Sequence, residues 1–266
     1  MAVTPVRRRH RPRKGWARLA VGVVGVIAVL GAAAASAAPV DPELVIAVDV
    51  SRSVDAEEAR LQRDGYVAAF SDPRVIDAIR SGPHGAIAVA YVEWSGAEQQ
   101  MTLIDWTRID EPTSAAAFAS RLAEAPRSSV GWTSVSGAID YAARLFVGNG
   151  YEGARLVIDI SGDGANNSGR LARLARDAAV AKGITINGLP ILNDRPNVGR
   201  PAETGLNVDY ETEVIRYYET EVIGGPGAFL IAVEDFRAFG RAILAKLLRE
   251  IAERPSPGTS AVAPLD

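Results

Sequence analysis

Short apolar runs alternate with longer amphipathic segments along most of this 266-residue chain. Runs such as LVIAVDV at 44–50 and LVIDI at 156–160 lack the polar alternation of a strand with one wet face. Such runs are typical of parallel strands covered on both sides, so the pattern predicts an open, doubly wound α/β sheet with helices on both faces. We expect strands at 44–50, 86–94, 101–106, 154–160, 184–191 and 228–233, and helices at 55–71, 74–81, 112–125, 133–147, 169–182 and 236–253.

Two parts of the chain depart from this pattern. The run at 101–106 alternates and follows its neighbour after a short turn, which predicts an antiparallel edge strand in an otherwise mostly parallel sheet. Residues 192–227 are long for a strand-to-strand connection and are interpreted as an insertion. They contain the hexapeptide YETEVI twice, eight residues apart, at 210–215 and 218–223. Eight residues do not close on a helical period, so this indicates a local duplication.

The first 38 residues differ in composition from the rest. Residues 1–18 carry seven Arg or Lys side chains and no acid, and 19–38 are apolar and rich in alanine. This is typical of a secretory signal peptide cleaved after Ala37 or Ala38. A retained anchor is the alternative, because the apolar run approaches the roughly 20 residues that span a bilayer. We therefore predict a periplasmic or secreted domain at 42–253, membrane-bound only if the signal stays, and a disordered Pro/Ser/Gly tail at 254–266.

Charge and residue usage exclude several functions. The chain has 29 basic and 32 acidic side chains, and the seven basic ones of the predicted signal leave 22 against 32, a formal charge of −10. Such a domain repels phosphate backbones, so we expect no nucleic-acid partner. The chain has no cysteine, and only His84 among histidines follows the predicted signal, which excludes thiolate or histidine-rich metal sites and cysteine nucleophiles.

Carboxylates and hydroxyls gather where apolar strands end. Asp49, Ser51 and Ser53 follow the first strand in DVSRS, Thr133 opens a helix in GWTS, and Asp163 follows a second apolar strand between two glycines. Loops at the carboxyl ends of strands form the binding site of a doubly wound sheet. An all-oxygen set of this kind suits Mg²⁺, with Mn²⁺ or Ca²⁺ as substitutes. Ser53 has an alternative role as the N-cap of the next helix.

In this order, the three motifs resemble the metal-ion-dependent adhesion site of the von Willebrand factor type A (VWA) domain. The resemblance covers about 44–253 and implies strand order 3-2-1-4-5-6, with Asp49 and Asp163 on adjacent strands. It also implies a partner protein whose Asp or Glu completes the metal shell. The resemblance gives the metal ligands, some through water, as Asp49, Ser51, Ser53, Thr133 and Asp163. Insertion 192–227 is not part of the minimal domain and looks like a feature of an uncharacterised bacterial branch.

Aromatic residues near these motifs are candidate partner contacts. Trp132 stands where the family commonly has a second glycine, and either lines the site or is a buried core residue. The insertion leaves the fifth strand at its carboxyl end, so we expect it to border the metal site and select the partner. Its residues Tyr210, Tyr217 and Tyr218 are typical contact residues. The alternative is a helix that covers the sheet edge with its tyrosines packed inward.

These observations predict an exported, metal-dependent protein-binding module rather than an enzyme. Two alternatives stay open. The first is a metal-dependent, phosphatase-like hydrolase, but a phosphatase of the haloacid dehalogenase type needs a second aspartate where Ser51 stands. A serine hydrolase is not favoured either, because the sequence has no G-x-S-x-G elbow and a Ser-His-Asp triad would have to use His84. The other alternative is a structural envelope protein whose metal site is unused.

Overall fold

The structure is a computed structural model that describes residues 1–2, 37–126, 131–192, 210–234 and 238–252. The folded domain lies within Ser36–Asp266. Most of the predicted signal peptide and the whole predicted tail lie outside the described residues. Within the described residues, no helix has both the length and the apolar character needed to cross a membrane.

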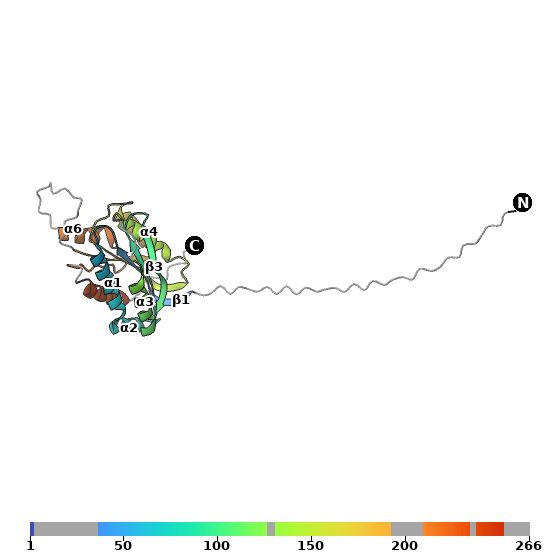
Figure 1. Ribbon diagram of the computed structural model, residues 1–266, viewed down its shortest axis with the longest axis horizontal. Coiled ribbons are helices and arrows are strands. Elements are labelled where there is room, and N and C mark those ends of the chain that lie inside the picture. Colours follow the sequence, from blue (N-terminus) through green and yellow to red (C-terminus); the bar gives the residue numbers. More distant parts are fainter. Residues whose placement is uncertain (3–36, 127–130, 193–209, 235–237, 253–266) are drawn as a thin grey trace. The chain divides into compact units, whose positions relative to one another are not determined.

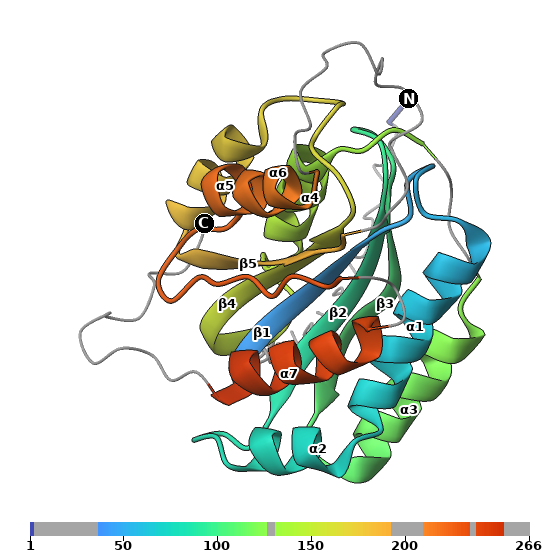
Figure 2. The same cartoon turned by 90° about the vertical axis from the view of Figure 1, so that its left-hand side faces the viewer.

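A five-stranded sheet forms the centre of the domain, in the order β3-β2-β1-β4-β5. Its strands are β1 (Ala38–Asp49), β2 (Ile87–Trp94), β3 (Gln100–Ile109), β4 (Tyr151–Gly162) and β5 (Ile184–Pro190). Strand β1 pairs in parallel with β2 and β4, β5 pairs in parallel with β4, and β3 runs antiparallel to β2. Figure 1 labels β1 and β3, and Figure 2 labels all five strands. The predicted sheet, mostly parallel with one antiparallel edge strand, is confirmed.

The predicted sixth strand at 228–233 is present only in part. The segment lies beside β5 and makes two isolated parallel bridges, Gly188↔Leu230 and Ile191↔Val233. The backbone N–H of Phe229 donates to the side-chain oxygen of Asn187 at 3.1 Å. Backbone hydrogen bonds also join it to Gly188, Pro190 and Leu192, but Pro190 has no N–H to donate, so the ladder is interrupted and the segment does not form a continuous strand. Prediction of a full strand at this position is therefore wrong.

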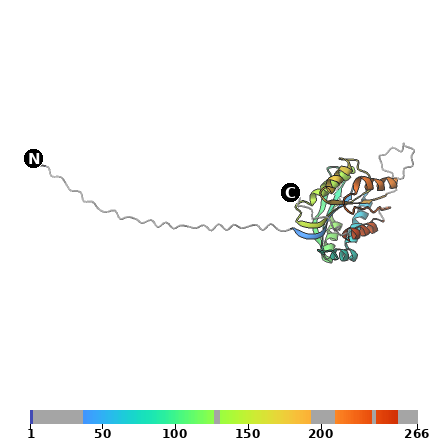
Figure 3. The ribbon, with the colours of Figure 1, turned by 180° about the vertical axis from the view of Figure 1, so that it is seen from behind.

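Helices cover both faces of the sheet, as predicted (Figure 2, and from behind in Figure 3). One face packs against α1 (Ala56–Phe70), α2 (Pro73–Arg80), α3 (Pro112–Glu124) and α7 (Phe239–Ala252). The other packs against α4 (Val135–Leu145), α5 (Ala172–Val180), α6 (Tyr210–Tyr217) and the π-helical turn η1 (Tyr218–Val222). In β1, Leu44 and Ile46 join the first core and Val45 and Ala47 the second, which explains why the run is apolar throughout.

Strand β1 begins earlier than predicted. Residues Ala38 and Val40 pair with Tyr151 and Gly153 of β4, whereas the sequence predicted a strand only from residue 44. Further along the chain, Asp55 caps α1: its carboxylate accepts the N–H groups of Glu57 and Glu58, and Glu58 accepts the N–H of Asp55. The alternative role of Ser53 as this N-cap is therefore wrong.

A charged cluster joins α7 to the sheet. The ammonium group of Lys246, fully buried, lies 2.5 Å from Asp159 Oδ1 of β4 and 2.6 Å from Glu250 Oε1. Asn187 of β5 also donates to Glu250 at 2.9 Å. Burial raises the pKa of Asp159 to about 7, against the opposing effect of the Lys246 charge, and Glu250 raises it further. The cluster fixes α7 to strands β4 and β5 of the sheet.

Candidate metal centre

Both candidate carboxylates lie at the carboxyl ends of neighbouring central strands. Asp49 is the last residue of β1, and Asp163 directly follows Gly162, the last residue of β4. The two strands are adjacent and parallel, with Val48 opposite Ser161. Parallel neighbours end at the same edge, so the sheet itself brings the two carboxylates together, on the adjacent strands that the resemblance implied.

The loop after β1 connects the two aspartates through hydroxyl groups. Asp49 Oδ1 accepts the backbone N–H of Ser51 at 2.7 Å, and the hydroxyl oxygens of Ser51 and Ser53 lie 3.1 Å apart. The Ser53 hydroxyl then donates to Asp163 Oδ1 at 2.7 Å. The loop thus folds back so that its side chains face β4.

Thr133 joins the same cluster from the loop before α4. Its hydroxyl donates to the Ser51 hydroxyl oxygen at 3.3 Å. The helix itself is capped by Ser134, whose hydroxyl oxygen accepts the N–H of Gly137 at 3.1 Å, so Thr133 precedes the first helical turn. All five residues that the sequence singled out as metal ligands are therefore linked by hydrogen bonds, from three separate loops. That they bind a metal ion stays a prediction.

The electrostatics of the cluster favour a cation. Asp49 and Asp163 are 0% and 2% exposed. Burial raises the pKa of Asp49 well above its usual value, the charge of Asp163 raises it further, and hydrogen bonds from Ser51 lower it. Among the described residues, none gives a hydrogen bond to Asp49 Oδ2, which is also buried. A positive ion would stabilise the charged form of this buried carboxylate, which lies beside a second carboxylate.

The donor set of the cluster consists of oxygen atoms. No group of three or more His, Cys, Asp or Glu side chains suited to a metal lies within the described residues, so an ion held here would also need the hydroxyls as ligands. Two carboxylates balance the charge of a divalent ion, and oxygen ligands suit Mg²⁺, Mn²⁺ or Ca²⁺. Gly162 is required here, because a Cβ on it would lie 2.9 Å from Asp49 Oδ2.

Two asparagines that the sequence analysis did not select hold the site loops together. Asn167 accepts the N–H of Thr133 on its side chain at 2.9 Å and donates its own N–H to the carbonyl oxygen of Thr133, also at 2.9 Å. Asn166 accepts the N–H of Ser136 at 3.0 Å. Both follow Asp163 in GDGANN, and only their place in a glycine-flanked loop after a strand could have pointed to them.

The predicted partner contacts divide into two groups. Trp132 is 71% exposed at the rim beside Thr133, so the alternative of a buried core residue is wrong. Tyr218 is 0% exposed and Tyr217 is half-buried, so both pack inward, as the alternative stated. The prediction that Tyr218 contacts a partner is therefore wrong. The side chain of Tyr210 lies outside the described residues.

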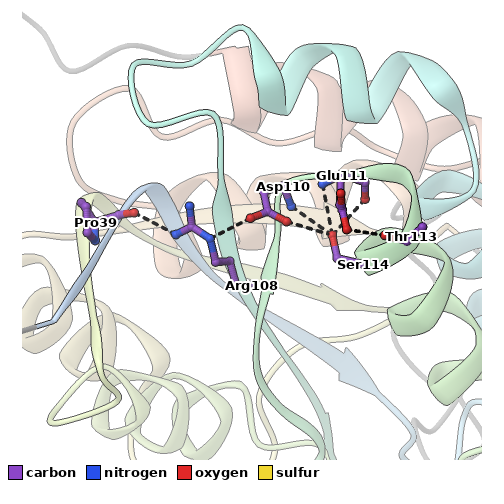
Figure 4. A network of polar contacts seen from close by, with 6 residues as sticks. All are labelled: Pro39, Arg108, Asp110, Glu111, Thr113 and Ser114. Carbon is purple, nitrogen blue, oxygen red and sulfur yellow. Dashed lines mark hydrogen bonds and ion pairs between the residues drawn. The ribbon is translucent and has the colours of Figure 1, made fainter. Parts of the chain in front are cut away.

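A hollow of about 700 Å³ lies at the other end of the sheet, where β1 and β4 begin, lined in part by Ala38, Arg108 and Tyr151. Two arginines line it, and one of them, Arg108, already has protein partners. Arg108 donates to Asp110 Oδ2 at 2.9 Å and to the carbonyl oxygen of Pro39 at 3.0 Å (Figure 4). Because this network joins β1, β3 and the start of α3, we assign it a structural role.

The fold resembles that of solved VWA domains. Solved structures share it: proximal thread matrix protein 1 from the mussel byssus, described as having a zinc-occupied MIDAS motif, is 15% identical with a TM-score of 0.51, over 82% of this chain and 46% of that one. The pilus adhesin SpaC of Lactobacillus rhamnosus GG is 14% identical with a TM-score of 0.52, over 82% and 31%. A von Willebrand factor type A structure from Catenulispora acidiphila is 14% identical with a TM-score of 0.50, over 80% and 42%.

The chain spans less than half the length of each of these structures, and at such identities the likeness concerns the fold. Residues 39–255 match the family described as "Protein of unknown function (DUF1194)", and the chain belongs to this family. No curated protein matches the sequence.

Proposed function

We propose that this domain is an exported, metal-dependent protein-binding module. The observation that carries the proposal is the buried carboxylate of Asp49, with one oxygen that accepts no hydrogen bond from the described residues, beside the carboxylate of Asp163. The ligands would be Asp49, Ser51, Ser53, Thr133 and Asp163, directly or through water. When bound, the ion supplies a positive charge that attracts an Asp or Glu of the partner.

The protein residues have separable roles in this proposal. Asp49 and Asp163 would hold the ion through their charged oxygens, and a carboxylate of the partner would complete its coordination. The hydroxyls of Ser51, Ser53 and Thr133 are already connected to one another and to Asp163, so little reorganisation is needed to orient them. Trp132, exposed at the rim, would bury apolar area against the partner around this polar contact.

Mg²⁺ is the expected ion, with Mn²⁺ or Ca²⁺ as substitutes. The zinc-occupied MIDAS motif of the mussel protein supports a divalent ion at this place in the fold, and it makes Zn²⁺ a necessary comparison in any assay. The present ligand set has no nitrogen or sulfur donor, so Zn²⁺ is not expected to bind better than Mg²⁺.

Other evidence supports an interaction role outside the cytoplasm. The N-terminal segment has the composition of a secretory signal, and one structure with this fold is a pilus adhesin. The identified cluster has neither the second aspartate of a dehalogenase-type phosphatase nor a histidine, so we propose no catalytic step. The partner is a protein, contacted through an acidic side chain, and membrane attachment would follow only from a retained N-terminal segment.

Two measurements test the proposal. Saturating Mg²⁺ should raise the melting temperature of the wild-type protein, and Asp49→Ala should abolish that gain while the circular dichroism spectrum stays native. Capture of partners from the native envelope should then require Mg²⁺, stop with chelator and fail with Asp49→Ala. If metal leaves the wild-type transition unmoved, the metal centre is wrong. If metal binds but capture is the same with chelator, the binding function is wrong.

A further inference from the structure

The insertion packs against the metal centre through its second YETEVI copy. This copy forms the π-helical turn η1, in which the N–H of Ile223 donates to the carbonyl oxygen of Tyr218, five residues back, at 2.9 Å. Val214, Tyr218 and Val222 belong to the core on this face of the sheet. Turns of this kind rotate side chains out of the α-helical register and are frequent at functional sites.

The ring of Tyr218 lies across two glycines of the sheet. A Cβ on Gly188 of β5 would lie 2.8 Å from Tyr218 Cδ1. A Cβ on Gly162 of β4 would lie 2.8 Å from the Tyr218 hydroxyl and 2.9 Å from Asp49 Oδ2. The absence of two side chains therefore makes the groove that holds this ring. At its end, the tyrosine hydroxyl and the Asp49 carboxylate oxygen flank the same glycine.

Tyr217 contacts the loop that carries the second carboxylate. Its hydroxyl oxygen accepts the backbone N–H of Asn166 at 3.1 Å. The side chain of Asn166 accepts the N–H of Ser136 in α4, and the next residue, Asn167, accepts the N–H of Thr133. The tyrosine thus supports a loop that starts at one candidate ligand, Asp163, and is hydrogen-bonded to another, Thr133.

We propose that Tyr217 and Tyr218 are positioning residues of the metal centre: Tyr218 sets the place of the Asp49 carboxylate, and Tyr217 holds the loop that presents Asp163. This inference rests on the proposed metal-binding function and extends it. It gives Tyr217 and Tyr218 a different role from the partner selection expected from sequence, because they contact the loop and the sheet beside the site. The insertion then tunes metal affinity.

The test is the affinity of the full chain for Mn²⁺, measured by isothermal titration calorimetry well below the melting temperature. Tyr217→Phe and Tyr218→Phe each keep the ring and remove the hydroxyl, and each should weaken Mn²⁺ binding about tenfold, as is common when the group that orients a metal ligand is lost. Gly188→Ala displaces the Tyr218 ring from the β5 side without contacting Asp49, and should weaken binding in the same direction.

Tyr141→Phe is the matched control. Its hydroxyl makes a comparable contact, 2.9 Å from Thr102 Oγ1, between α4 and the edge strand β3. This variant should bind Mn²⁺ as the wild type does. If Tyr217→Phe and Tyr218→Phe also bind like the wild type, or only melt at lower temperature, the tyrosines serve packing alone and the inference is wrong, while the metal centre stands. If the wild type binds no better than Asp49→Ala, the proposed function fails, and the inference with it.

Discussion

Replacing Asp49 by asparagine should change the stability of this domain in opposite directions with and without metal. In the metal-free protein Asp49 is 0% exposed, and its pKa is raised by burial and by the charge of Asp163. A carboxyl whose pKa is higher in the folded state destabilises the fold as the pH rises above its unfolded value. At pH 7.5 the neutral, similarly shaped amide therefore removes an unfavourable charge.

The magnitudes follow from this geometry. Because burial and the charge of Asp163 raise the pKa of Asp49, Asp49→Asn should stabilise the chelator-treated protein at pH 7.5. With the ion at 100 times its dissociation constant, the wild type gains about 2.7 kcal/mol by mass action. For a domain of this size that is a rise of roughly 5–10 °C in melting temperature, which the variant should lack.

Differential scanning calorimetry with Mg²⁺ and with chelator measures both effects. The variant should melt above the wild type in chelator and below it in Mg²⁺. Asp64→Asn is the control, since Asp64 is 57% exposed in a surface pair with Arg60 and should change stability by less than about 0.5 kcal/mol in either condition. If Asp49→Asn is destabilised equally with and without metal, Asp49 serves only as the acceptor for the Ser51 N–H, and the electrostatic reasoning is refuted.

Three further predictions concern the core and the rim. Lys246→Met leaves Asp159 and Glu250 buried without their cation and should lower the free energy of unfolding by about 3–5 kcal/mol in urea denaturation, whereas Lys182→Met on the exposed surface should not. Because the pKa of Asp159 is raised to about 7 in the fold, the wild type should lose up to ~1.4 kcal/mol per unit as the pH rises from 4 to 7 relative to Asp159→Asn. Parallel stability profiles of the two would contradict this. Trp132→Ala should change stability by less than about 0.5 kcal/mol and leave Mg²⁺ affinity unchanged, yet weaken partner capture; equal capture would remove Trp132 from the interface.

Most of the fold could be predicted because the alternation of apolar strands and amphipathic helices is a local signal. Each strand of the parallel core has its apolar run, and each helix has its caps or its apolar face. The segment at 228–233 has the same kind of run but forms bridges only, because Pro190 of β5, distant in sequence, has no N–H to donate to it. A pattern read along one segment does not show which groups the neighbouring strand can donate.

The duplicated hexapeptide shows the limit of local reasoning most directly. One copy of YETEVI lies in α6, starting at Tyr210, and the other forms the π-helical turn that starts at Tyr218. Identical residues therefore adopt different helical forms. The difference arises from tertiary contacts, because Gly162 and Gly188 provide the groove that holds the second copy. This is also why the inward direction of Tyr218 could not be decided from the sequence.

The candidate site was easier to predict than its support. Asp49, Ser51, Ser53, Thr133 and Asp163 stand at strand ends or a helix start, so topology alone brings them together. The side chains of Asn166 and Asn167 accept backbone N–H groups at the start of α4, and Asn166 donates its own N–H to Tyr217. These partners depend on the tertiary arrangement of three segments that are distant in sequence. No spacing within GANN encodes those partners.

The central claim is that these five residues hold a Mg²⁺-type ion. A crystal structure of the protein grown with Mn²⁺, with anomalous scattering recorded at the manganese edge, tests it most directly. We expect one strong anomalous peak at the carboxyl ends of β1 and β4, about 2.1 Å from its oxygen ligands and surrounded by Asp49, Ser51, Ser53, Thr133 and Asp163, directly or through water. No peak there at saturating Mn²⁺, or a peak only elsewhere on the domain, would contradict it.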